Sequence, residues 1–173
     1  SQVNDSIRVV PSNTCGSGAA IYLGVSTVSV SVQASADDTI CLGDTIDLSA
    51  TGGSSYLWST GSSDSIIYVY PAVTSTYTVT GSYGGCTASD MVVVTVIAPV
   101  ADAGEDATVC YGTSVLLTAT GGDTYLWSNG AQTDTNRVTP ITDTSYIVTV
   151  TLNSCTASDQ INLSVDHIQI TTG

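Results

Sequence analysis

Five cysteines are the residues of this 173-residue chain whose spacing says most about chemistry. They stand at positions 15, 41, 86, 110 and 155, and two pairs of them share a spacing of 45. No Cys-x-x-Cys occurs, so the pattern does not resemble a zinc or dithiol redox site. Widely and regularly spaced cysteines in small domains are typical of disulfides in secreted proteins. We therefore predict an oxidising, extracellular setting.

Groups for catalysis are few. His167 is the only histidine, lysine is absent, and no P-loop, nucleophile elbow or zinc-protease motif occurs. A serine–lysine dyad is therefore impossible, and we expect no catalytic triad or metal cluster on one histidine that has no repeat counterpart. The sequence predicts that the chain is not an enzyme and has no catalytic or cofactor-binding residues.

Carboxylates crowd two short segments. Asp102, Glu105 and Asp106 form one group, and Asp37 and Asp38 hold the corresponding place earlier in the chain. Oxygen ligands of this kind could hold calcium, which would be the one cofactor; solvated charge is the alternative interpretation. With a net charge of −13 the chain repels phosphate backbones and anionic lipid surfaces, so we expect no nucleic-acid partner. No apolar stretch approaches the roughly 18 residues of a membrane helix, so we expect no membrane insertion.

An internal repeat of 69 residues organises the chain. Residues 37–96 and 106–165 share 25 identities in 60 positions without a gap. Thr-Gly-Gly-x-x-Tyr-Leu-Trp-Ser occurs at 51–59 and 120–128, and Cys-Thr-Ala-Ser-Asp at 86–90 and 155–159. The chain is therefore a duplication, and each copy has to position its own cysteines and tryptophan.

Each copy reads as six or seven short strands between turn residues. Alternating apolar residues, such as Ile46, Leu48 and Ala50, predict half-buried strands, and Thr, Val, Tyr and Ile outnumber the helix formers. We predict an all-β fold of two tandem Ig-like or PKD-like β-sandwiches. The domains would be residues 1–36, a partial upstream repeat ending in a hairpin; 37–98, the first sandwich; and 99–173, a linker plus the second.

Within each copy, one cysteine precedes the first strand and one stands at the final turn. This arrangement predicts the disulfides Cys41–Cys86 and Cys110–Cys155, each stapling one small domain. Cys15 is then unpaired within the chain. Its partner would lie either in missing upstream strands or in a neighbouring subunit.

Four aromatic residues recur at equal positions in both copies. For Trp58 and Trp127 we expect core packing, with a sugar-stacking platform as the alternative. Tyr77 and Tyr146 are expected to point inward or to bond backbone as corner tyrosines. Exposed coplanar aromatics on one sheet face would favour carbohydrate binding.

The second copy carries a family likeness in four segments. Residues 101–115, 124–130 and 145–150, together with Cys155, resemble the PKD-like or Ig-like tandem repeats of Bacteroidota surface proteins. The resemblance implies an extracellular location at the bacterial cell surface, export by type IX secretion, and cell adhesion, stalk or filament work that includes gliding motility. It carries no catalytic residues to this chain.

The resemblance also implies O-glycosylation of Asp-Ser/Thr-aliphatic triplets. Four triplets fit, with the hydroxyls of Ser6, Thr39, Thr45 and Ser65. The primary functional hypothesis is a non-catalytic structural or adhesive module whose partners are further repeats of the same protein or neighbouring subunits. The alternative is a carbohydrate-binding accessory module of a secreted polysaccharide-degrading enzyme, with a glycan as ligand.

Overall fold

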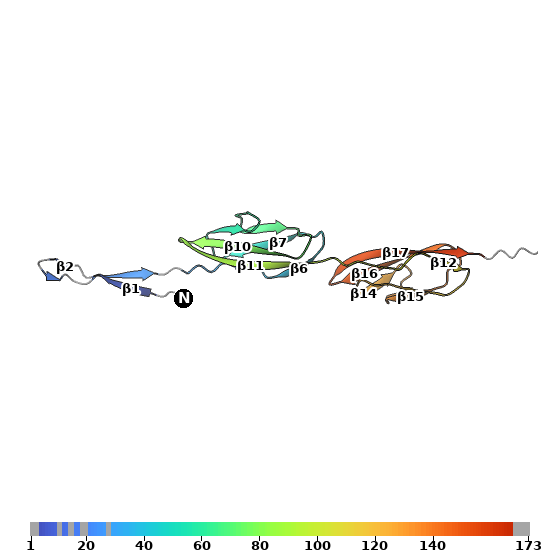
Figure 1. The fold of residues 1–173 in the computed structure, drawn as a ribbon. Helices are drawn as coiled ribbons and strands as arrows, with labels where there is room; N and C mark the ends of the chain where they lie inside the picture. The colour runs from blue at the N-terminus through green and yellow to red at the C-terminus, as the bar shows by residue number, and fades with distance from the viewer. Residues whose placement is uncertain (1–3, 10–11, 14–15, 18–20, 27–28, 168–173) are drawn as a thin grey trace, which may run out of the picture. The chain divides into compact units, whose positions relative to one another are not determined.

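The computed structural model describes residues 4–9, 12–13, 16–17, 21–26 and 29–167 (Figure 1). The regular secondary structure in these ranges consists of β-strands alone. The same ranges contain no helix that could cross a membrane. The all-β prediction is confirmed, and the two copies fold as Ig-like β-sandwich domains. The abundance of β-branched and aromatic residues accounts for this, because such side chains pack well on a pleated sheet.

The first copy builds two sheets. One has the strand order β6-β11-β10-β8 and the other β5-β7-β9. Inward and outward positions alternate on β7, so that Leu48 and Ala50 are buried while Asp47 is exposed. The strands are β5 Gln33–Ala34, β6 Asp38–Cys41, β7 Ile46–Thr51, β8 Ser55–Trp58, β9 Ile66–Val69, β10 Ser75–Tyr83 and β11 Cys86–Ile97.

The second copy repeats this plan. Its sheets have the orders β12-β17-β16-β14 and β13-β15, and a single antiparallel bridge between Asp102 and Thr120 replaces β5. Leu117, Val148, Val150 and Leu163 are among the most deeply buried side chains of its core. The strands are β12 Ala107–Cys110, β13 Val115–Thr118, β14 Thr124–Trp127, β15 Thr135–Val138, β16 Thr144–Leu152 and β17 Cys155–Asp166.

Each core is built around one indole. Trp58 is 2% exposed and Trp127 is 1% exposed. Both indole N–H groups donate to backbone carbonyls, that of Trp58 to Asp64 at 2.9 Å and that of Trp127 to Thr133 at 3.0 Å. The ring is thus buried with its one polar group satisfied, which is the arrangement a core tryptophan needs. Neither indole face is available as a sugar platform.

The first strand of the second copy runs parallel to the last strand. In the β12–β17 pair, Ala107 lies opposite Leu163 and Cys110 lies opposite Asp166. Cys110 therefore stands at the C-terminal end of β17, whereas Cys155 begins that strand. The two cysteines of one copy lie at opposite ends of the sheet.

Tight turns close the last hairpin of each copy. The loop residues between β10 and β11 are Gly84 and Gly85, and those between β16 and β17 are Asn153 and Ser154. All four have positive φ, at 58°, 85°, 47° and 68° in that order. Two consecutive positive φ values are the signature of a type I′ turn, whose twist matches the flanking strands.

The N-terminal segment contains further antiparallel pairs. β1 Asn4–Val9 pairs with β4 Ile21–Ser26, and β2 Ser12–Asn13 pairs with β3 Gly16–Ser17. Cys15 lies outside the described residues. That this segment closes an upstream repeat stays a prediction.

The chain divides into two compact units whose bounds cut across the repeat. Cys41 and the end of β6 belong to the unit that holds the second copy. The domain bounds 1–36, 37–98 and 99–173 stay predictions. The first unit is Ser1–Asp38, Thr45–Tyr70 and Ser75–Val94, and the second is Thr39–Asp44, Pro71–Thr74 and Thr95–Gly173.

Candidate functional site

One disulfide joins the two sequence copies. Cys41 bonds Cys155, with an S–S distance of 2.03 Å, a Cα–Cα distance of 5.4 Å and a sequence separation of 114. The predicted pairings Cys41–Cys86 and Cys110–Cys155 are therefore wrong. The bond connects the first strand of one copy with the final hairpin of the next, instead of closing each copy on itself.

Strand length explains the error. The N–H of Leu42 donates to the carbonyl of Ile97 at 2.9 Å, so Cys41 lies beside the C-terminal end of β11. Cys86 begins that strand, eleven residues before Ile97. At about 3.3 Å per residue the two ends of β11 are roughly 36 Å apart. A disulfide needs Cα atoms within about 7 Å, so Cys41 and Cys86 cannot meet.

A pocket of about 180 Å³ surrounds the disulfide. Cys155 is 2% exposed there, although it starts a strand at a turn. The walls come from the end of β6, from the segment that follows β11 and from the final hairpin of the second copy. The lining residues are Cys41, Leu42, Ile97, Ala98, Pro99, Cys155 and Thr156.

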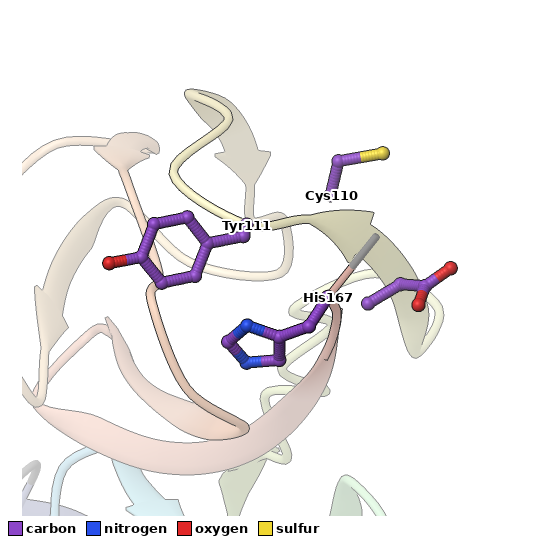
Figure 2. Close-up of a pocket in the computed structure, with 4 residues that line it drawn as sticks. Cys110, Tyr111 and His167 are labelled. Carbon is purple, nitrogen blue, oxygen red and sulfur yellow. The ribbon is translucent and has the colours of Figure 1, made fainter. Parts of the chain in front are cut away.

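A second pocket, of about 330 Å³, lies at the end of β12 and β17. It is lined by Cys110, Tyr111, Asp166 and His167 (Figure 2). The thiol of Cys110 is exposed and makes no disulfide. The N–H of Tyr111 donates to the carbonyl of Asp166 at 3.0 Å, and its ring centroid is 5.0 Å from that of His167.

A thiol, an imidazole and a carboxylate thus share one pocket, which sequence reasoning did not anticipate. Nucleophilic catalysis requires the imidazole within hydrogen-bond reach of the thiol. Figure 2 shows the sulfur of Cys110 directed away from the imidazole of His167, whose ring lies beside Tyr111 instead. The arrangement therefore presents an outward thiol rather than a thiol–imidazole pair. Cys110 and Asp166 end two strands whose parallel pairing brings them together, and the sequence offered no signal for that pairing.

Carboxylates of the predicted calcium group make protein hydrogen bonds. Asp106 accepts the side-chain amide of Asn162 at 3.0 and 3.1 Å and the backbone N–H of the same residue at 2.7 Å. These bonds, the side-chain one first, lower the pKa of Asp106 below its usual value of 3.8. Asp102 accepts the N–H of Gly104 at 2.8 Å. Both carboxylates thus have structural partners.

The described part of the chain contains no group of three or more His, Cys, Asp or Glu side chains arranged to hold a metal ion. Glu105, like Asp102 and Asp106, is exposed. Calcium binding stays a prediction for these three residues. A melting temperature that rises with calcium and falls with chelator would support it, and an unchanged one would contradict it.

Another pair of carboxylates anchors backbone in both copies. Asp90 accepts the N–H of Ala34 at 2.9 Å, and Asp159 accepts the N–H of Ala103 at 2.8 Å. The bond from Ala34, followed by one from the N–H of Met91, lowers the pKa of Asp90. The repeated Cys-Thr-Ala-Ser-Asp motif therefore ends in a carboxylate that ties β11 or β17 to the segment entering its sandwich.

Two pairs of tyrosines recur at equal positions in the two copies, Tyr77 with Tyr146 and Tyr56 with Tyr125. Tyr77 and Tyr146 are half-buried, and Tyr146 packs against the core of the second copy. The tyrosines that bond backbone are Tyr56 and Tyr125, whose hydroxyls donate to the carbonyl of the glycine three residues earlier at 3.0 and 2.8 Å. The Gly-Gly-x-x-Tyr spacing, present in both copies, was the available signal.

Three of the predicted glycosylation sites are on the surface. Thr39, Thr45 and Ser65 are exposed. The side chain of Ser6 lies outside the described residues. Exposure is what a modifying enzyme requires, and modification itself stays a prediction.

Comparison with solved structures finds tandem Ig-domain proteins. No family model matches, and no curated protein matches. The chain is similar at 12% identity to titin domains I67–I69, covering 81% of this chain and 67% of that one with a TM-score of 0.47. It is similar at 11% identity to extracellular domains 3–5 of Drosophila OTK, covering 84% and 67% with a TM-score of 0.44. It is similar at 17% identity to the eight N-terminal Ig domains of Down Syndrome Cell Adhesion Molecule, covering 90% and 30% with a TM-score of 0.36.

Proposed function

We propose that this chain is a non-catalytic structural module of a bacterial cell-surface adhesin, working outside the cell as part of a stalk or filament. The observation that carries the proposal is the Cys41–Cys155 disulfide, which ties one sandwich repeat covalently to the next. Disulfides persist in oxidising compartments and are rare in the cytosol, so the bond supports an extracellular location.

The build of each repeat supports the same role. Tryptophan, valine and leucine fill the interior of each sandwich. The carboxylates of Asp90, Asp106 and Asp159 accept backbone hydrogen bonds within their sandwiches, and the thiol of Cys110 is exposed. A repeated unit with an apolar core and structurally bonded polar side chains serves as a spacer, and further repeats can lengthen it.

The sequence resemblance supplies the finer assignment. It points to a Bacteroidota surface protein exported by type IX secretion, with gliding-type adhesion among the activities of such proteins. The partners would be further repeats of the same protein or neighbouring subunits.

Immunoelectron microscopy of intact source cells tests the location and the assembly. Antibody against this chain should decorate extracellular filaments or stalks with a regular axial spacing. Inactivation of type IX secretion should leave the protein inside the cell envelope. Labelling only after permeabilisation would overturn the extracellular role, and unchanged export would overturn the secretion route alone.

Carbohydrate binding is the second candidate, and one observation favours it. Tyr68 lies in β9 and is 74% exposed, and Tyr70 directly follows the end of that strand and is 78% exposed. If the extended backbone of β9 continues through Tyr70, the two rings project to the same side and offer sugars a stacking surface. Glycan-array binding that disappears in Tyr68→Ala and Tyr70→Ala variants would establish this function. Binding to no glycan would remove it.

O-glycosylation would fit the same setting. Thr39, Thr45 and Ser65 are the exposed candidates, with Ser6 as the fourth. Intact mass spectrometry of the native protein should show hexose-containing additions that Thr→Ala and Ser→Ala variants lack. A mass equal to that of the bare sequence would refute the proposal.

A further inference from the structure

The two cysteine pockets are the same pocket, repeated 69 residues apart. The described residues that line the pocket at Cys110 are four, and each is the counterpart of a residue that lines the pocket around the disulfide. The remaining described residues of the disulfide pocket are Pro99 and the incoming pair Cys155 and Thr156. The shift by 69 converts Cys41, Leu42, Ile97 and Ala98 into Cys110, Tyr111, Asp166 and His167.

The backbone frames of the two pockets also agree. The N–H of Leu42 donates to Ile97 at 2.9 Å, and that of Tyr111 donates to Asp166 at 3.0 Å. A backbone hydrogen bond also closes the turn after each cysteine. The N–H of Asp44 donates to the carbonyl of Cys41 at 3.0 Å, and the N–H of Thr113 donates to that of Cys110 at 3.0 Å. The backbone of Cys110 is therefore held as that of Cys41 is held.

The pockets differ in what fills them. At Cys41 the pocket holds Cys155 and Thr156, and about 180 Å³ of space is left. At Cys110 the pocket is open, with about 330 Å³, and its thiol is exposed. The pocket at Cys110 has the larger volume, as expected if a Cys-Thr turn fills part of the pocket at Cys41 and none of the pocket at Cys110.

We infer that the pocket at Cys110 receives the closing Cys-Thr turn of a further repeat of this kind, placed in tandem after the second copy, and forms a disulfide with its cysteine. The Cys41–Cys155 bond would then be one member of a series in which every repeat is bonded to the next. This inference rests on the proposed structural function and adds the covalent mode of assembly.

The bond forms by thiol–disulfide exchange with a small disulfide such as oxidised glutathione. One of the two cysteines first forms a mixed disulfide with glutathione and releases one glutathione thiolate. The second cysteine, as thiolate, attacks the protein sulfur of that mixed disulfide, and the second glutathione leaves with the electron pair and takes up a proton. In sum, two protein thiols lose two electrons and two protons, and the small disulfide is reduced to two thiols.

A three-copy protein tests the inference. Residues 1–167 are joined to a second run of residues 99–173, which keeps Asp166 and His167 in place. The appended duplicate of Cys155 then follows Cys110 by 114 positions, the separation found between Cys41 and Cys155. The protein is folded with oxidised and reduced glutathione, alkylated, digested without reductant and analysed by mass spectrometry.

We expect Cys110 to be linked to the duplicate of Cys155 in monomeric protein, and alkylation of Cys110 to fall from nearly complete in the two-copy chain to a few per cent. The duplicate of Cys110 in the third copy should stay reactive and serves as an internal control. In a Cys110→Ser variant the duplicate of Cys155 should become reactive.

Three results would overturn the inference. They are a bond between the two duplicated cysteines of the third copy, alkylation of both Cys110 and the duplicate of Cys155, and links formed only between molecules. A second three-copy protein, with residues 30–98 appended to residues 1–167, presents the duplicate of Cys86 at the same place. Cooperative unfolding of the appended copy shows that it has folded. If the first three-copy protein lacks it, the disulfides of the second three-copy protein are the test. If neither protein forms the bond to Cys110, the proposal is wrong. Immunoelectron microscopy remains a separate test of the function.

Discussion

Asn136 is a polar residue at a core position where the first copy has an apolar one. It is 4% exposed, and its counterpart Ile67 is 6% exposed. The Asn136 amide exchanges two hydrogen bonds of 3.1 Å with the amide of Asn129, which is exposed. The interior of the second sandwich therefore depends on a surface residue to satisfy a buried group.

Removal of that partner should destabilise the second sandwich. Asn129→Ala leaves the buried amide of Asn136 unsatisfied, which should lower the free energy of unfolding by about 1–3 kcal/mol. Adding Asn136→Ile, the residue of the first copy, should restore stability to the original value or above it, because both partners are then gone. Urea denaturation of the single and double variants measures this. A single variant within about 0.5 kcal/mol of the parent would contradict it.

Asp106 makes stability depend on pH in acid. Its pKa is lowered from 3.8 in the folded chain by the bonds from Asn162. A carboxyl with a lowered folded pKa stabilises the fold above its unfolded pKa, and this stabilisation is lost as pH falls through the folded pKa. Asp106→Asn cannot titrate, so the variant should have a lower melting temperature at pH 7 and a smaller drop between pH 5 and pH 2. Parallel curves for the two proteins would contradict this.

At the scale of residues, the sequence was informative where the repeat carries the signal. The single tryptophan of each copy, placed between turns, predicted a buried ring, and the indoles of Trp58 and Trp127 are buried. It was not informative for Asn136, because an isolated asparagine between Thr135 and Arg137 gives no sign of burial. Only the alignment with Ile67 marks that position as interior.

At the scale of elements, the closing hairpins offer a matched pair of turns. Ser154 has φ 68°, a left-handed conformation, and its counterpart Gly85 has φ 85°. A residue with a Cβ pays roughly 1–2 kcal/mol there, and glycine does not. Ser154→Gly should therefore raise the free energy of unfolding of the second sandwich by about 1 kcal/mol, and Gly85→Ser should lower that of the first by a similar amount. Differential scanning calorimetry of both variants measures the shifts, and shifts of the same sign would contradict the assignment.

The strands themselves were predictable, but one pairing was not. Alternation identified the buried face of β7 from Leu48 and Ala50, and turn residues marked the strand ends. Nothing in the residues of β12 shows that it pairs in parallel with the last strand of its copy. That pairing places Cys110 beside Asp166 rather than near Cys155, and it is the physical reason that the expected disulfides fail. A four-residue strand carries too little pattern to encode its partner's direction.

At the scale of the whole molecule, the duplication predicted the architecture. Two copies of one sequence that each satisfy an all-β pattern have to form two equivalent sandwiches, and they do. Whether a cysteine bonds within its copy or across to the next is a property of the tandem and not of the unit. The spacing of 45 inside each copy favoured a bond within the copy. That prediction was wrong because the spacing carries no information on strand direction.

The Cys41–Cys155 bond also determines how the chain carries a mechanical load. Tension applied between residues on either side of the bonded pair passes through the sulfur atoms, so residues 42–154 are outside the loaded path. At about 3.5 Å per extended residue, this shielded segment holds roughly 400 Å of slack. Single-molecule stretching should release that length only after reductant is added, and a Cys155→Ser variant should release it without reductant. Equal extension of the oxidised and reduced chains would show that the bond bears no load. If the lengths differ as expected, the redox state outside the cell determines how far the molecule can extend.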